Sequence, residues 1–334
     1  MNSTLKSNIF AGSLIVIGIF GGLFLSLVLS FLNVPLPGIL LLGQIILLLI
    51  PTILYFIITK ESVKKTLRLN WPGWLTVLFS FLIAIFIQPL MMVLSAITSL
   101  FFTNDVADLI NQMDAYPTLL MLAIVALTPA ICEEITMRGI LLSGYDGVDI
   151  KKAMLLNGLF FGMLHLNLQQ FLYAFALGAL FAYMVRLTDS IIPSMVAHFT
   201  INGSQVLMQK LLMFMTKTFN QDLSALTHEP SFIEKLISLG AISVVALIIT
   251  PIAGVLIYAL RDLYVKKSLK QENFKEPIET TDQKVFIESV PDEHENDIRL
   301  LEPSRQKVFN WPVWVSIVLY IAFMLFTLVL EYLL

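Results

Sequence analysis

The chain has 334 residues, of which 57% are hydrophobic and only 13% charged, and its net charge is −3. Its mean hydropathy of +0.83 excludes a water-soluble globular protein, and its slightly acidic balance gives no sign of a nucleic-acid partner. The single cysteine, Cys132, excludes an intrachain disulfide.

Nine apolar segments recur along the chain, most of them near the ~20 residues that span a bilayer. They cover residues 8–31, 39–59, 72–102, 118–143, 152–166, 169–187, 191–214, 234–260 and 311–333. The first is too long for a signal-peptide core and lacks a small-residue cleavage site, so we expect it to be retained. The predicted fold is an all-α polytopic transmembrane helix bundle, with about eight core helices and one extra C-terminal helix.

The basic residues predict how this bundle is oriented. If the N-terminus is cytoplasmic, seventeen of the twenty-one Lys and Arg residues fall in cytoplasmic segments. This bias follows the positive-inside rule and places the C-terminus on the opposite side. We expect an integral protein of a bacterial plasma membrane, because no eukaryotic retrieval signal ends the chain.

Composition divides the chain into three parts. Residues 1–262 form a polytopic membrane domain, with the functional core at about 70–260. Residues 263–310 are charged with scattered hydrophobic residues, which predicts a mostly disordered cytoplasmic linker. Residues 311–334 add one transmembrane helix.

The similar sequences NWPGW (70–74) and NWPVW (310–314) predict two helix starts, because Asn caps helices and Pro suits the first helical position.

All deep ionisable residues lie on three predicted helices. Glu133, Glu134 and Arg138 belong to the fourth span, His165 to the fifth and His198 to the seventh. Each charged group at the bilayer centre costs about 2.5–3.5 kcal/mol, so such residues usually face the bundle interior and mark function. Glu134 and Arg138 are four residues apart and can pair, while Glu133 points about 100° around the helix from Glu134.

These residue types suit water attack on an amide carbonyl. A carboxylate and an imidazole can hold a water and take its proton. His198 and Asn202, four residues apart on one helix face, could donate hydrogen bonds to the oxyanion. The residues alone leave open catalysis, ion or substrate translocation, and structural hydrogen bonds between helices. A proton-coupled transporter is disfavoured because no inverted repeat or paired broken helices are evident.

Three short motifs carry a resemblance to a known family. The pattern E-E-x-x-x-R occupies residues 133–138, F-x-x-x-H occupies 161–165, and H-x-x-x-N occupies 198–202. In order and separation they resemble the CAAX protease and bacteriocin-processing (Abi) family over roughly residues 70–260. That family consists of intramembrane glutamic endopeptidases and includes the type II CAAX prenyl protease.

The resemblance implies a role for each motif residue. Glu133 and His165 would activate water, and His198 and Asn202 would form the oxyanion hole. Glu134, Arg138 and Phe161 would support the site. The resulting hypothesis is a peptidase that cleaves a peptide or membrane-protein substrate within the lipid bilayer.

Two further expectations accompany this hypothesis. No cofactor and no metal are expected, because H-E-x-x-H is absent and the candidate ligands lie on three separate helices. The alternative function is a catalytically idle family member that acts as a membrane scaffold or as a regulator of a partner such as a sensor kinase.

Overall fold

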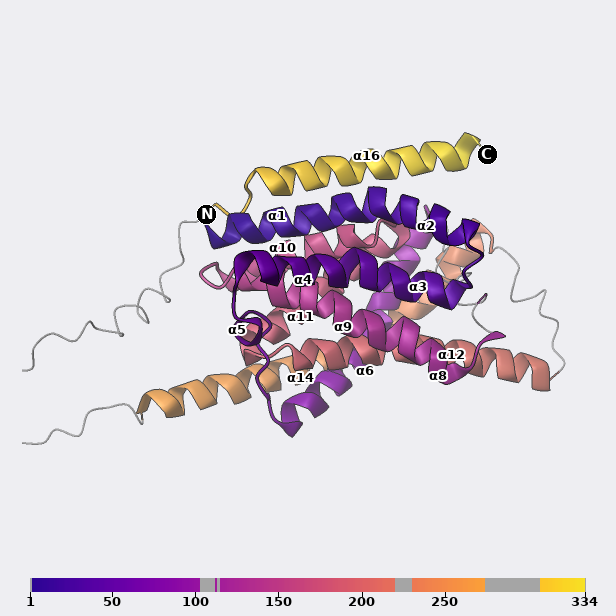
Figure 1. Ribbon diagram of the computed structural model, residues 1–334. Coiled ribbons are helices and arrows are strands. Elements are labelled where there is room, and N and C mark those ends of the chain that lie inside the picture. Colours follow the sequence, from indigo (N-terminus) through magenta and orange to yellow (C-terminus); the bar gives the residue numbers. More distant parts are fainter. Residues whose placement is uncertain (1, 103–111, 113–114, 220–229, 274–306, 334) are drawn as a thin grey trace, which may run out of the picture.

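The computed structural model describes residues 2–102, 112, 115–219, 230–273 and 307–333. Every regular element in this part of the chain is a helix, which confirms the predicted all-α bundle. The long helices run side by side, and the N- and C-termini lie at opposite ends of the bundle (Figure 1).

Each of the nine predicted spans corresponds to a helix or to consecutive helical segments. The first is α1 (Ser3–Val16), η1 (Ile17–Gly21) and α2 (Gly22–Phe31); the second is α3 (Leu36–Gln44), η2 (Ile45–Leu49) and α4 (Ile50–Thr59). After the short α5 (Val63–Thr66) come α6 (Trp74–Ser99) and a fourth span made of α8 (Thr118–Met121), η4 (Leu122–Leu127), α9 (Thr128–Glu134) and η5 (Ile135–Leu141). The remaining five are α10 (Ile150–Leu164), α11 (Leu168–Thr188), α12 (Ile192–Thr218), α14 (Phe232–Asn273) and α16 (Trp311–Leu333). The η segments are π-helical.

Seven of these nine segments are long and apolar enough to cross a membrane, so the chain is an integral membrane protein. The other two are α10 and α12. Helix α10 has 15 residues, about 22 Å, which is shorter than a hydrocarbon core of about 30 Å. Helix α12 has 27 residues, but its polar side chains lower its hydropathy.

Helices α10 and α11 form a hairpin whose tip lies inside the bundle. Gly158 and Gly178 allow the two helices to touch, since a Cβ on Gly178 would stand 2.8 Å from the Gly158 Cα. At the tip, a Cβ on Gly18 would stand 3.3 Å from Leu166 Cδ1. Because Gly18 is midway along the first span, the end of α10 lies at about half the depth of the bundle.

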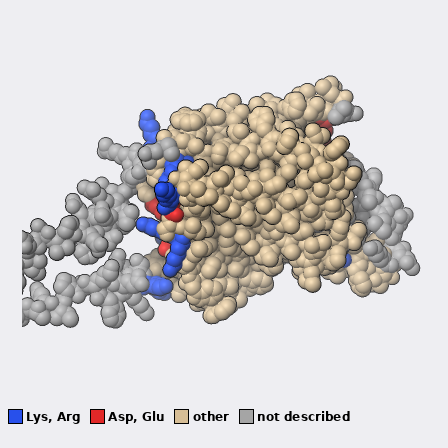
Figure 2. All heavy atoms as spheres, viewed as in Figure 1, with Lys and Arg blue, Asp and Glu red and all other residues tan. Residues whose placement is uncertain are grey.

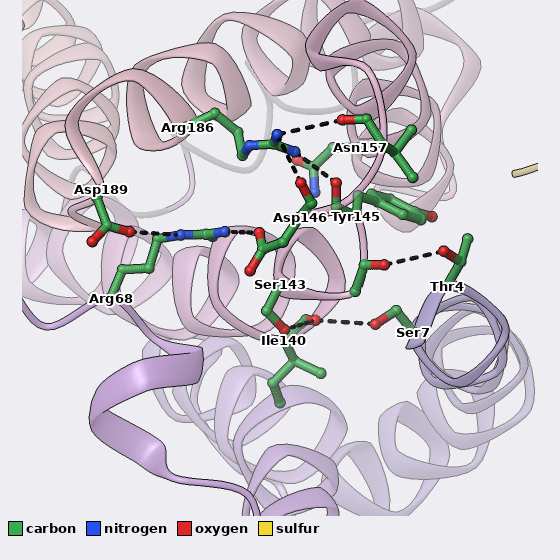
Figure 3. Close-up of polar contacts among 12 residues, drawn as sticks. Thr4, Ser7, Arg68, Ile140, Ser143, Tyr145, Asp146, Asn157, Arg186 and Asp189 are labelled. Atoms are coloured by element: carbon green, nitrogen blue, oxygen red, sulfur yellow. Dashed lines mark hydrogen bonds and ion pairs between the residues drawn. The ribbon is translucent and has the colours of Figure 1, made fainter. Parts of the chain in front are cut away.

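The basic residues in the described part gather mainly at the end of the bundle that holds the N-terminus (Figure 2). Here Arg68, just after α5, joins two loops, because its guanidinium pairs with Asp146 and its Nε lies 3.2 Å from Asp189 Oδ1 (Figure 3). The Arg68 carbonyl also accepts a hydrogen bond from the Ile191 N–H at 3.2 Å. We call these residues the Arg68 network.

Two neighbouring sets of hydrogen bonds hold the loop between η5 and α10. Arg186 donates to the carbonyls of Tyr145, Asp146 and Val148 at 2.7–3.3 Å. Thr4, on α1, donates to the Gly144 carbonyl at 3.1 Å (Figure 3). The fourth span, which carries the glutamates, is thereby anchored at its basic end.

The predicted linker differs from the structure at its start. Helix α14 continues to Asn273, so residues 263–273 are helical, and an Asp262–Lys266 pair four residues apart at 2.6 Å supports this extension. Residues 274–306, most of the predicted linker, lie outside the described residues.

Only one of the two NWPxW sequences starts a helix as predicted. Helix α16 begins at Trp311, directly after Asn310. In the first copy the helix begins only at Trp74, because Gly73 has a φ of 92° and Asn70 donates to the Asp189 carbonyl and carboxylate at 2.8 and 2.9 Å.

Candidate active site in the membrane

The fourth span brings a fully buried ion pair into the bundle. Arg138 Nη1 lies 3.2 Å from Glu134 Oε1, and both side chains are 0% exposed, which confirms the predicted pairing. The Arg138 guanidinium also lies 4.2 Å from the Phe161 ring centroid and 5.2 Å from that of Phe181. Two aromatic rings and one carboxylate thus replace water around this cation.

His198 lies between the two adjacent glutamates. Its Nδ1 is 2.9 Å from Glu134 Oε1, and its Nε2 is 3.9 Å from Glu133 Oε2. The ion pair with Arg138 fixes the Glu134 carboxylate, which in turn orients the imidazole ring. The rings of Phe161 and Phe181 pack beside His198, with centroids 6.0 and 5.7 Å away.

Glu133 accepts a hydrogen bond from an amide side chain on the second span. Its Oε1 accepts a hydrogen bond from Gln44 Nε2 at 2.9 Å, where Gln44 is the last residue of α3. Its Oε2 is buried and has no hydrogen-bond partner among the described residues. One carboxylate oxygen is therefore held, and the other is available near His198.

Glu133 and His165 line one cavity. Its volume is about 180 Å³, and most of its wall is apolar. The lining residues are Leu14, Gly18, Gly43, Gln44, Leu47, Leu48, Glu133, Leu164, His165 and Leu166. His165 stands at the C-terminal end of α10, with Nδ1 2.8 Å from the Phe161 carbonyl oxygen. Since a carbonyl oxygen only accepts, this contact assigns a hydrogen to Nδ1, and in the neutral ring Nε2 then keeps its lone pair.

Asn202 lies one turn beyond His198 on α12 and does not line this cavity. Its Nδ2 donates to the Val125 carbonyl oxygen at 3.1 Å. Val125 belongs to the π-helical segment η4, and π-helical turns often occur at functional sites. The second amide hydrogen and the carbonyl oxygen of Asn202 remain for other partners.

Glu133 and His165 thus line the same cavity, and His198 Nε2 lies 3.9 Å from Glu133 Oε2. Glu134 bonds the other ring nitrogen of His198, Arg138 pairs with Glu134, and the Phe161 ring packs against Arg138. Among the described residues, no group of three or more His, Cys, Asp and Glu side chains is arranged to hold a metal ion.

Gln44 and Phe181 contact the site but were not predicted from the sequence. The predicted site residues came from the ionisable groups within the spans and the three motifs, and Gln44 is uncharged and lies in no motif. An amide within the otherwise strongly apolar segment 36–59 was the available signal. Phe181 gave no such signal, because one aromatic residue in a membrane helix looks like any other packing residue.

Residues 115–204, the segment that carries all seven predicted site residues, match the family described as type II CAAX prenyl endopeptidase Rce1-like. No curated protein and no solved structure matches the chain.

Proposed function

We propose that the chain, which belongs to the CAAX protease family, hydrolyses a peptide bond of a peptide or membrane-associated substrate with a water activated by Glu133. One observation carries this proposal: Glu133 Oε2 is buried without a hydrogen-bond partner among the described residues and lies 3.9 Å from His198 Nε2, and Glu133 lines the same cavity as His165. Glu134 Oε2 also has no partner among the described residues, but of the two glutamates only Glu133 lines the cavity, which favours a catalytic role for Glu133.

The spacing suits a water molecule. A separation of 3.9 Å is too long for a direct hydrogen bond but allows one water oxygen to bond both Glu133 Oε2 and His198 Nε2. The carboxylate takes a proton from this water as its oxygen attacks the carbonyl carbon of the substrate, and Glu133 then gives that proton to the amide nitrogen as the C–N bond breaks. His165 lines the same cavity, and its Nε2 in the neutral ring is a second acceptor for protons there.

The oxyanion formed by this attack needs hydrogen-bond donors. Asn202 has one amide hydrogen left after its bond to the Val125 carbonyl. His198 can donate from Nε2 when both of its ring nitrogens carry hydrogen, and the Glu134 carboxylate then lies 2.9 Å from Nδ1 of the resulting cation. Arg138 and Phe161 act behind His198 by keeping Glu134 and the ring in place.

The basic end of the bundle, which holds the N-terminus, belongs in the cytoplasm under this proposal. Its Lys and Arg residues follow the positive-inside rule. Glu133 lies eight residues before the end of η5, about 12 Å from that end of the span. Water would therefore have a shorter route to the site from the cytoplasm.

The direct test compares the new protein N-termini in membranes that contain the wild-type chain or Glu133→Gln. Replacing the carboxylate removes the base, and general-base catalysis contributes roughly 10²–10⁴-fold, so a defined set of N-termini should disappear. Cys132→Ser is the matched control. Its thiol is buried beside Glu133 and has no role in the mechanism, so the same N-termini should persist.

Two results would contradict the proposal. One is an unchanged set of N-termini in Glu133→Gln membranes that hold normal amounts of folded protein. Function would then lie in binding a partner, as in the scaffold alternative. The other is loss of all cleavage in well-folded Cys132→Ser, which would point to thiol chemistry.

A further inference from the structure

We infer that Gln44 is a positioning residue that holds the Glu133 carboxylate so that Oε2 faces His198. This inference rests on the proposed role of Glu133 as the base. Gln44 lies outside the segment 115–204 that matches the family. The second span of this chain would therefore contribute to the active site.

The hydrogen bond from the Gln44 amide determines which oxygen of the Glu133 carboxylate faces His198. Gln44 Nε2 donates to Glu133 Oε1 at 2.9 Å, which restricts rotation of the carboxylate about its last bond. With Oε1 held, Oε2 is the oxygen that lies 3.9 Å from His198 Nε2. Hydrogen bonds to charged groups are about twice as strong as neutral ones, so this contact can define the orientation.

The backbone around Gln44 suits this task. Gln44 ends α3, and the π-helical segment η2 begins at the next residue. Beside it, a Cβ built on Gly43 would meet no atom within 4 Å, so Gly43 leaves the cavity open next to the amide. Gln44 Oε1 is itself buried without a hydrogen-bond partner and lines the cavity. The amide thus has one end on Glu133 and the other available to water or substrate.

A structural role for Gln44 predicts a different outcome from a positioning role. Gln44→Met keeps the length of the side chain and is more apolar, so packing and membrane insertion should be preserved. It removes the donor to Glu133. If Gln44 only fills space, Gln44→Met should cleave at the wild-type rate.

The experiment measures kcat and KM for a fluorescence-quenched peptide that spans a cleavage site identified with the Glu133→Gln comparison. We expect Gln44→Met to lower kcat about ten- to hundred-fold, as for loss of one hydrogen bond to a charged group, with KM changed less than about three-fold. Thermal unfolding of the purified variant checks that it is folded at the assay temperature.

The matched control is Gln88→Met in α6. Gln88 is also an amide within a span, and its Oε1 accepts a hydrogen bond from Ser204 at 2.8 Å rather than contacting Glu133. The kcat of Gln88→Met should stay within about two-fold of the wild-type value.

The outcomes separate this inference from the proposed function. If Glu133→Gln is inactive but Gln44→Met keeps its kcat within two-fold, the positioning role is wrong and the proposed function stands. If Gln44→Met and Gln88→Met lose kcat equally, the effect is a general one of buried amides, and the positioning role is again wrong. If Glu133→Gln remains active, the proposed function itself fails.

Discussion

Two arginines of this protein pair with carboxylates in very different surroundings. Arg138 and Glu134 are both 0% exposed, at 3.2 Å from each other and in the middle of the bundle. In the Arg68 network the arginine side chain is 7% exposed, but its partners Asp146 and Asp189 are 56% and 73% exposed. Water can replace a lost partner in the network, whereas water does not reach Arg138 or Glu134.

The difference shows how location decides what an ion pair contributes. Two buried charges are expensive to remove from water, so the Arg138 pair adds little net stability but makes loss of one partner severe. A pair with exposed partners contributes less and is screened by salt. The membrane pair therefore serves mainly to hold His198, while the Arg68 network fastens loops.

The largest effect is expected for Arg138→Ala. It leaves Glu134 as an uncompensated buried charge, which costs about 3–5 kcal/mol, and expression and thermal stability should fall together with activity. The double variant Glu134→Gln with Arg138→Gln removes both charges and should recover part of this stability. Thermal unfolding of the purified variants provides the measurement. A double variant no more stable than Arg138→Ala would show that the two residues do not act as a pair.

A smaller effect is expected for Arg68→Met, which keeps the apolar part of the side chain and removes its charge. The loss should be about 1–2 kcal/mol, because the exposed partners Asp146 and Asp189 regain water. Raising the salt concentration should shrink the difference from wild type, whereas the cost of Arg138→Ala should barely change. Equal losses of unfolding free energy in Arg68→Met and Arg138→Ala at both salt concentrations would contradict the expected difference between the two arginines.

The smallest effect is expected at Glu61, also at the basic end. Burial alone would raise the pKa of Glu61, but hydrogen bonds from Lys6 and Tyr55 outweigh it and hold the pKa below its usual value of 4.5. A lowered folded-state pKa adds stability above the unfolded value, and this stability is lost as the pH falls through the folded value. Glu61→Gln should therefore lower the free energy of unfolding at pH 7 by about 1 kcal/mol or less, which should lower Tm slightly.

The pH series makes that prediction specific. As the pH falls through the lowered folded-state pKa of Glu61, the wild-type carboxyl becomes protonated, so the Tm curves of wild type and Glu61→Gln should converge on the acid side. Curves that stay parallel down to acid pH would mean that the Glu61 charge makes no contribution.

Much of the fold could be predicted from the sequence, because a bilayer forces apolar segments to form helices that satisfy their own backbone hydrogen bonds. All nine predicted spans are helical, and most of their ends agree within a few residues. The Glu134–Arg138 pair was predictable for the same local reason, since it depends only on helical spacing. The NWPxW sequences show the limit of local reasoning: in the second copy the helix starts at Trp311, directly after Asn310, but in the first it starts only at Trp74, after Gly73 and an Asn70 that is bound to Asp189.

What the sequence by itself determined is therefore the set of helices, the residues with charge inside the membrane, and the three motifs of the family. Only the tertiary structure decided which groups meet. It placed His198 against Glu134, ended α10 inside the bundle so that His165 reaches the cavity, and brought Gln44 from a distant span to Glu133. These contacts depend on how helices far apart in the chain pack against each other, and neither hydropathy nor spacing within one helix carries that information.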